Sequence, residues 1–427
     1  MEQLNVTVAI TGAVVLCLGL LSTRIDRASM SAPLVALVIG ILCGPFGAGW
    51  IMPASWPNSE TVLKEAARFT LAISVFGIAM RTPVQSYRRL VRPVAVLLSL
   101  GMVTMWAVSG ALGWALLGLP PLAAMALGAA LAPTDPVVAS SIVTGKMAER
   151  ALPDRLRSTL SLESGANDGL GYLLVLLPVQ FTRHDPARAW EAWFVDTLVI
   201  GVLAAVAAGA VLGWLSALAL ETAARRRWAE KHSQLSMTVA LSLTVLAAVK
   251  LLGSDGILAA FAAGAAFNMT ASRRHEREEE NVQEAISKLF NLPVFVILGA
   301  ALPVGGWVAL GWQGVALAIL MLALRRPVAL MVCGPFLGPG ITRADRIFLG
   351  WFGPVGVAAL YYALHLTELT GEVAIWHAAS LVIVASVLAH GLSSAVGLSL
   401  YPTPSDTRTA FLSAISSGSA PCSCMIR

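Results

Sequence analysis

The stretch that decides the fold is "TLSLESGANDGLGYLLVLLP", residues 159–178. Its second half is apolar enough to lie in a lipid bilayer, whereas its first half carries the carboxylates of Glu163 and Asp168 and the amide of Asn167. A charge at the bilayer centre costs at least about 2.5–3.5 kcal/mol on insertion scales, so carboxylates inside a span are functional candidates. The stretch therefore predicts a membrane-spanning helix that contains part of a site.

Composition places the whole chain in the membrane. Of its 427 residues 57% are hydrophobic and only 12% are charged, compared with about 25% charged in soluble domains. Apolar stretches long enough to span a bilayer recur from residue 4 to residue 400. They lack the alternation that membrane β-barrel strands show. We therefore expect an all-α polytopic membrane protein.

The apolar stretches predict about thirteen transmembrane helices. Their approximate limits are 4–21, 31–50, 63–80, 93–117, 121–144, 158–180, 192–219, 234–253, 256–270, 288–303, 306–332, 346–366 and 373–397. Basic residues concentrate in the odd-numbered loops, and the even-numbered loops carry only Lys64, Arg68, Arg183 and Arg188. Because cytoplasmic loops are enriched in Lys and Arg, the N-terminus is expected outside and the C-terminus inside.

Three further segments complete the predicted organisation. Residues 1–400 form one transmembrane domain, and 401–427 form a short cytoplasmic tail whose Ser, Thr and Pro content predicts disorder. The run "RRHEREEE" (273–280) is interpreted as a solvated cytoplasmic loop. The role of the tail pair Cys422 and Cys424 stays open, because a terminal CxC alone is weak evidence for a metal or redox site.

A second unusual stretch is "AALAPTDPVVASS" (129–141), which places two prolines inside a predicted span. Pro133 and Pro136 lack an N–H group and clash with the preceding turn, so the helix should be interrupted near mid-membrane. Unwound backbone at that depth is tolerated only where it is buried or lines a wet cavity. Freed carbonyls, the Thr134 hydroxyl and the Asp135 carboxylate are hard oxygen ligands, which suit a small cation.

The opening stretch divides into two helical faces. Residues four apart share a face, so Ser164 lies below Asp168 and Glu163 lies below Asn167. The first face can offer oxygens to an ion, and the second can bind neighbouring helices. Glu163 then needs a counter-charge.

Candidates for that counter-charge occur in "LALRRPVAL" (322–330), where Arg325 and Arg326 precede Pro327, a predicted helix breaker. We favour an ion pair between Glu163 and one of the two arginines. The rival interpretation is an arginine that extends its head group to the cytoplasmic edge of the membrane.

The stretch "GWFGPVGVAAL" (350–360) predicts a second interrupted helix, at Gly353, Pro354 and Gly356. Two interrupted spans in corresponding positions of two halves are typical of inverted-repeat transporters with a site at the membrane midplane. A core bundle would then comprise the spans of 93–180 and 306–397. The spans of 4–80 and 192–303 would form a panel against which the core moves.

These motifs together resemble a known family. "APTDPV" (132–137) followed by "ESGANDG" (163–169) is similar to the monovalent cation:proton antiporters of the electroneutral sodium/proton exchanger branch, which includes NhaP-like proteins. The resemblance implies that Asp168 binds the ion and the proton and that Asn167 stabilises the crossed helices. It implies that Glu163 pairs with Arg326, with Arg325 as second choice. It implies that the ion shell is completed by Thr134, Asp135 and Ser164, with the metal ligands being Asp168, Ser164 and Thr134.

The resemblance also implies a homodimer formed through the panel. No cofactor beyond the transported ions is expected, and the net charge of +5 needs no nucleic-acid partner because the placement of the basic residues in loops explains it. Many relatives carry an arginine where this chain has Val355, and some carry an acidic residue in the third span, where Ser74 is the polar residue here. The choice among Na⁺, K⁺ and Li⁺ therefore stays open, with Na⁺ favoured. Asn167 replaces the Asp of electrogenic relatives, which indicates one ion exchanged per proton.

The expected function is exchange of a monovalent cation for H⁺ by alternating access, in a bacterial inner membrane. A cation-coupled symporter of a small organic solute is the alternative, although no cluster of polar or aromatic residues indicates a larger cavity. A channel is a further alternative that a test of electroneutrality would distinguish. An intramembrane hydrolase is disfavoured because the chain contains no HExxH motif, so we do not expect an enzyme.

Overall fold

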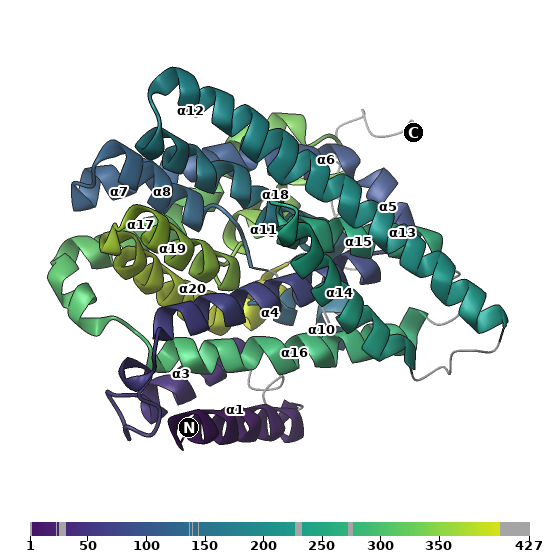
Figure 1. Ribbon diagram of the computed structural model, residues 1–427, viewed down its shortest axis with the longest axis horizontal. Coiled ribbons are helices and arrows are strands. Elements are labelled where there is room, and N and C mark those ends of the chain that lie inside the picture. Colours follow the sequence, from purple (N-terminus) through teal and green to yellow (C-terminus); the bar gives the residue numbers. More distant parts are fainter. Residues whose placement is uncertain are drawn as a thin grey trace, which may run out of the picture.

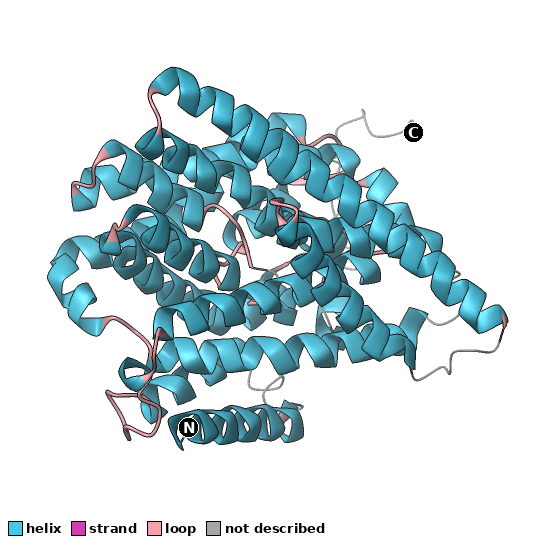
Figure 2. Ribbon diagram, viewed as in Figure 1, coloured by secondary structure: helices cyan, strands magenta, loops and turns pink. Residues whose placement is uncertain are grey.

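The computed structural model describes residues 2–22, 24, 31–135, 137–138, 140–143, 145–226, 233–271 and 276–401. Within these ranges every regular element is a helix, as Figure 2 shows, so the all-α expectation is confirmed. Pro136, Cys422, Cys424 and residues 402–427 lie outside the described ranges. The predictions made for them stay predictions.

The N-terminal half of the chain contains the first interruption, which follows α8. Its elements are α1 (Glu2–Leu20), α3 (Ala32–Cys43), η1 (Pro53–Ser55), α4 (Ser59–Arg81), α5 (Val84–Arg89), α6 (Val91–Val96), η2 (Leu97–Gly101), α7 (Met102–Leu117), α8 (Pro121–Leu131), α9 (Ser140–Val143), α10 (Gly145–Ala151) and α11 (Asp154–Arg183). The π-helical η2 joins α6 and α7 into one continuous span, Val91–Leu117.

The second half contains the second interruption. Its elements are α12 (Pro186–Ala192), η3 (Trp193–Leu203), α13 (Ala204–Arg225), α14 (Ser233–Leu251), α15 (Gly256–Thr270), α16 (Glu276–Ala300), α17 (Val304–Cys333), η4 (Gly334–Phe336), α18 (Arg343–Trp351), α19 (Val357–Thr370) and α20 (Val373–Leu400). Each of the thirteen predicted ranges overlaps at least one of the observed helices.

Length and composition identify helices that can cross a membrane. Five described segments are long and apolar enough to cross a membrane, namely Glu2–Leu20, Val91–Leu117, Pro186–Arg225, Val304–Phe336 and Val373–Leu400. Shorter apolar helices include Ala32–Cys43, Pro121–Leu131 and Gly256–Thr270. Helices that are short or interrupted must have their ends satisfied by neighbouring protein, because the bilayer core offers no hydrogen-bond partners.

The helices pack in two sets that meet at α11. In one set α15 packs along α13 and α4, while α16 packs on α3 and α4, with α1 at the outer edge (Figure 1). In the other set α17 packs on α7, α18 and α20. The helix α11, which carries the opening stretch of sequence, contacts α8 and α19 on one side and α4 and α15 on the other.

Both predicted helix interruptions are present. The helix α8 ends at Leu131, where Ala132 donates its N–H to the Ala129 carbonyl at 3.3 Å in a tighter turn. The helix α18 ends at Trp351, and five residues of extended chain precede α19. The two extended segments meet where the Asp135 N–H donates to the Pro354 carbonyl at 2.8 Å.

Three expectations about helix limits were wrong. The helix predicted over 31–50 ends at Cys43, because Gly44 is followed by Pro45, which cannot donate to the helix ladder. The charged run 273–280 is not a loop throughout, since α16 begins at Glu276.

Pro327 also differs from its prediction as a helix breaker. The helix α17 continues through it to Cys333, and its non-helical residue is instead Gly311, at φ 60°. Glycine adopts this left-handed conformation without steric cost, so the kink forms there. Packing of α17 against α7, α18 and α20 keeps the helix intact around the proline.

Candidate functional site

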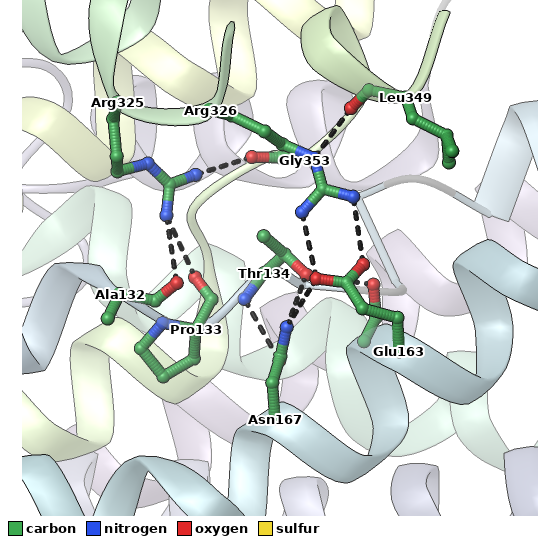
Figure 3. Close-up of polar contacts among 10 residues, drawn as sticks. Ala132, Pro133, Thr134, Glu163, Asn167, Arg325, Arg326, Leu349 and Gly353 are labelled. Atoms are coloured by element: carbon green, nitrogen blue, oxygen red, sulfur yellow. Dashed lines mark hydrogen bonds and ion pairs between the residues drawn. The ribbon is translucent and has the colours of Figure 1, made fainter. Parts of the chain in front are cut away.

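The Arg325 side chain lies at the crossing of the two interrupted helices. Its Nη1 donates to the carbonyls of Leu131 at 2.5 Å and Ala132 at 3.1 Å, and less closely to that of Pro133 at 3.3 Å. Its Nη2 donates to the Gly353 carbonyl at 2.5 Å. Figure 3 shows the guanidinium between the two extended segments. A single buried cation therefore satisfies carbonyls that both interruptions release.

The neighbouring Arg326 has a different partner. Its Nη1 and Nη2 donate to the two carboxylate oxygens of Glu163 at 2.9 and 2.8 Å, and its Nε donates to the Leu349 carbonyl at 2.6 Å. The side chains of Arg326 and Glu163 are 3% and 1% exposed. Both arginines are buried, so the interpretation in which they reach the membrane edge is wrong. The ion pair forms through Arg326, as the family resemblance implies.

Asn167 connects the first interruption to this ion pair. Its Oδ1 accepts the Thr134 N–H at 3.1 Å. Its Nδ2 donates to the Thr134 hydroxyl at 2.8 Å and to the Glu163 carboxylate at 3.0 Å. An aspartate at this position would lack the two N–H donors, and it would also add a charge beside Glu163. The amide therefore holds the extended segment against α11.

Asp135 has a role that sequence alone did not predict. Its Oδ1 accepts the N–H of Val137 at 2.6 Å, and its Oδ2 accepts the N–H of Val357 at the start of α19. A carboxylate at a helix N-terminus is stabilised by the helix dipole. The approach requires Gly356, because a Cβ there would lie 2.0 Å from the Asp135 Oδ2. The carboxylate therefore caps α19, in addition to the ion-shell role expected for it.

Asp168 is the site carboxylate that lacks such partners. The residue is fully buried, and neither of its carboxylate oxygens accepts a hydrogen bond from a described residue. Its main-chain carbonyl accepts the Tyr362 hydroxyl at 2.6 Å. A buried, unpaired carboxylate is costly when charged, so it requires a proton or a cation.

The Ser164 and Thr134 hydroxyls complete the set of predicted ion ligands. They form one hydrogen bond at 2.9 Å, which joins α11 to the first interruption. Ser164 precedes Asp168 by one helical turn and both are buried, so they share a face of α11. The structure thus places Thr134 beside Ser164, and Ser164 below Asp168.

Three residues that sequence reasoning missed bond to main-chain groups of the site, and two of them act at the second interruption. The Ser386 hydroxyl on α20 accepts the Val355 N–H at 2.8 Å, and the ring of His390 lies 2.9 Å from the Trp351 carbonyl. Tyr362 is the third, through its bond to Asp168. Ser, His and Tyr inside an apolar helix carry no pattern of their own. The only indication in the sequence was Pro354 itself. A helix interrupted there leaves main-chain N–H and C=O groups without helical partners, and these groups need polar side chains nearby.

Ser74, the polar residue of the third span, does not join this cluster through any described hydrogen bond. Its hydroxyl accepts the side-chain N–H of Asn291 on α16 at 3.0 Å. The contact therefore links α4 to α16 and lies within the set of helices that also contains α3 and α15.

Comparison with known proteins gives a consistent result. The family described as sodium/hydrogen exchanger, transmembrane, matches residues 12–398. A Na⁺/H⁺ antiporter of Saccharomyces cerevisiae is 30% identical over 342 residues, covering 77% of this chain and 34% of that protein. The K⁺/H⁺ antiporter NhaP2 of Shewanella oneidensis is 26% identical over 381 residues, covering 88% of this chain and 63% of that protein.

A solved structure shares the fold. The sodium proton antiporter MjNhaP1 from Methanocaldococcus jannaschii superposes with a TM-score of 0.72 at 16% identity, covering 93% of this chain and 99% of that chain. The predicted all-α polytopic fold is thereby confirmed, and its two interrupted helices meet as expected. The chain spans about a third and just under two thirds of the two curated relatives, at 34% and 63%. None of these three proteins is named as a symporter, so that alternative gains no support.

Proposed function

The chain belongs to the sodium/hydrogen exchanger family, and from this premise we propose that it exchanges a monovalent cation for protons across the membrane. Na⁺ is the first candidate, with K⁺ and Li⁺ as the others, since the relatives above are named for Na⁺ and for K⁺. The observation that carries the proposal is Asp168, whose buried carboxylate oxygens have no described partner.

The charges of the buried cluster favour exchange of one cation for one proton. The cluster contains three carboxylates, on Asp135, Glu163 and Asp168, and two guanidiniums, on Arg325 and Arg326. Glu163 is neutralised by Arg326, and Asp135 lies at a helix N-terminus. Either one H⁺ or one monovalent cation on Asp168 brings the cluster to neutrality. A site that binds either one proton or one monovalent cation, but never both, exchanges the two ions without net movement of charge.

The same energetics couple the two fluxes. An empty, ionised Asp168 is a buried unpaired charge, and moving it through the apolar interior is costly. The protonated and the cation-bound forms are neutral and can move. We propose that the core bundle carries the site between the two sides by moving against the panel formed by the spans of 4–80 and 192–303. The cation would bind to oxygens of Asp168, Ser164 and Thr134, while Asn167 and Arg325 hold the extended segments in place.

The direct test is Asp168→Asn in proteoliposomes. We expect the variant to fold and to lose cation-driven proton movement, measured by dequenching of a pH-sensitive dye on addition of Na⁺, K⁺ or Li⁺ in turn. The matched control is Asp154→Asn, which makes the same chemical change on the same helix at a side chain that is 88% exposed. Exchange retained by the Asp168 variant would refute the assignment, as would loss in both variants. The cation titration of the unmodified protein identifies the preferred ion.

Orientation and assembly belong to the same proposal. The basic odd-numbered loops support an N-terminus outside and a C-terminus in the cytoplasm. We propose a homodimer through the panel on the basis of the family resemblance. A bacterial inner membrane stays a prediction, because the relatives above come from a yeast and from a bacterium.

A further inference from the structure

A groove of about 570 Å³ lies between the inner half of α17 and the helix α18, away from the ion site. Apolar side chains of both helices line it, among them Leu330, Met331, Ile347 and Trp351. Met331 and Ile347 are 78% and 68% exposed, so the groove opens at the outer surface of the helix bundle. In a membrane-spanning chain, this surface faces lipid.

The groove is polar at one end and apolar at the other. Arg343 and Arg346 lie in the first turn of α18, at the end of the bundle where the basic loops lie. From Arg343 to Trp351 the helix rises about 12 Å, at about 1.5 Å per residue. The apolar end is therefore close to the middle of a hydrocarbon layer about 30 Å thick. This polarity matches a phospholipid with its head group at the arginines and its acyl chains toward the bilayer centre.

The guanidiniums of Arg343 and Arg346 can pair with the phosphate of such a head group. Among the described residues, no carboxylate lies within ion-pair distance of either guanidinium, and the buried Nε of Arg346 has no hydrogen-bond partner. The guanidinium of Arg92 lies nearby, where its Nε donates to the Phe336 carbonyl at 3.0 Å. Arginine binds phosphate oxygens through paired N–H donors, and basic clusters at the cytoplasmic ends of spans attract anionic lipids.

We propose that this groove is a binding site for one anionic phospholipid of the inner leaflet. The phosphate group binds Arg343 and Arg346, and an acyl chain packs along Leu330, Met331 and Trp351. The occupant contacts the helix that leads into the second interruption, since the Leu349 carbonyl accepts a hydrogen bond from Arg326. Bound lipid therefore stabilises the packing of α18 on α17 next to the buried ion pair.

The test measures lipid binding and does not depend on transport. Purified full-length protein in detergent is titrated with phosphatidylglycerol, and the affinity of the first retained lipid is measured by native mass spectrometry. The double variant Arg343→Gln/Arg346→Gln should bind this lipid about thirtyfold more weakly, since each basic residue near an anionic surface contributes about 1 kcal/mol. Phosphatidylcholine should bind the unmodified protein weakly, and glycerol 3-phosphate should not compete.

A matched control and a steric variant make the result specific to the groove. Arg225→Gln/Arg226→Gln removes the same charge at the C-terminal end of α13, which lies at the right-hand edge of the bundle in Figure 1, whereas α18 lies near its centre. It should keep the affinity of the unmodified protein. Gly350→Leu places a side chain in the groove, where a Cβ meets its nearest atom at 3.7 Å. It should weaken binding without changing any charge, and it keeps the test valid if the double arginine variant fails to fold.

Three results would overturn the proposal. Equal binding of phosphatidylglycerol and phosphatidylcholine would indicate a general lipid annulus. Competition by glycerol 3-phosphate at similar concentration would indicate a site for free phosphate. Unchanged affinity in both the double arginine variant and the Gly350→Leu variant would place the bound lipid elsewhere on the protein.

Discussion

Two adjacent arginines serve two different parts of the site. Successive residues on a helix point about 100° apart, so Arg325 faces the crossing of the extended segments while Arg326 faces α11. Arg325 donates to main-chain carbonyls, and Arg326 donates to the carboxylate of Glu163. A guanidinium presents donors in a planar fork, so each arginine reaches several acceptors at once. Replacing either by lysine would remove that geometry while keeping the charge.

The Glu163–Arg326 pair gives the prediction at the residue scale. In Glu163→Gln the buried Arg326 loses its counter-charge, which costs roughly 3–5 kcal/mol for a buried pair. We expect a clearly lower apparent melting temperature of the purified protein in detergent. The double variant Glu163→Gln/Arg326→Gln should lose less stability than the sum of the two single variants, because both remove the same interaction.

The control for this prediction is Glu65→Gln, which makes the same change in the partly exposed pair with Arg68 on α4. Surface pairs contribute about 0–1 kcal/mol, so this variant should melt close to the unmodified protein. Equal melting temperatures for the Glu163 and Glu65 variants would contradict the prediction that loss of the buried pair destabilises the protein more than loss of the partly exposed pair.

The sequence predicts the site residues that carry a charge inside a membrane span. It does not predict the site residues that lie outside the family motifs and whose polar side chains are uncharged. Glu163, Asp168 and the arginine pair stood out because ionised groups are rare inside spans. Tyr362 and Ser386 also bond to main-chain groups of the site, but one buried hydroxyl in an apolar helix is common. The capping role of Asp135 depends on which N–H groups the second interruption brings to it, and only the tertiary structure fixes that.

At the scale of elements, the site exists because α8 and α18 stop and the chain continues in extended form. The extended segments that follow release main-chain groups, and these are satisfied by Arg325, by the Asp135 carboxylate and by the Ser386 hydroxyl. Proline alone does not explain where helices stop. Pro327 lies inside α17, which continues past it, whereas Pro354 lies in extended chain between glycines. The glycines around Pro354 allow the close contacts that stabilise the extended form.

Gly356→Ala tests this explanation. A Cβ at this position would lie 2.0 Å from the Asp135 Oδ2, so the carboxylate must leave the N-terminus of α19. We expect a loss of folded protein or of cation-driven proton exchange by at least about tenfold, since losing a capping interaction costs about 0.5–2 kcal/mol before the steric clash is counted. Folded yield is measured by size-exclusion chromatography, and exchange by dye dequenching.

The matched control is Gly350→Ala on the same interrupted span. Its added Cβ meets the nearest atom at an ordinary 3.7 Å, and Ala favours a helix more than Gly does. This variant should keep both yield and exchange. If Gly356→Ala behaved in the same way, the close approach of Asp135 to α19 would not matter for the site.

At the scale of the whole molecule, the two sets of helices also pack directly on each other where α4 meets α19, and polar contacts lie at this boundary. One of them is an ion pair between Lys64 on α4 and Glu368 on α19, with His365 of α19 at 3.7 Å from the same carboxylate. The Lys64 side chain is 10% exposed and that of Glu368 is 55% exposed, so solvent screens the pair from one side. Its position is more informative than its energy, because α4 belongs to the proposed panel and α19 to the proposed core.

If the core moves against the panel during transport, Lys64 and Glu368 must separate in one of the two states. Linking the two positions should therefore stop exchange. We expect that Lys64→Cys/Glu368→Cys, in a background without native cysteines and treated with a short bifunctional thiol reagent that is reducible, loses proton exchange in proteoliposomes. Exchange should return when the reductant releases the link, because the protein itself remains intact.

Glu65→Cys/Arg68→Cys provides the comparison, since both positions lie on α4 and a link between them spans no boundary. Its exchange should survive the same treatment. Undiminished exchange in a fully linked Lys64/Glu368 protein would mean that α4 and α19 keep their relative position through the cycle. The boundary between moving and static helices would then have to lie elsewhere, and the assignment of α4 to the panel would be wrong even though the ion site is unchanged.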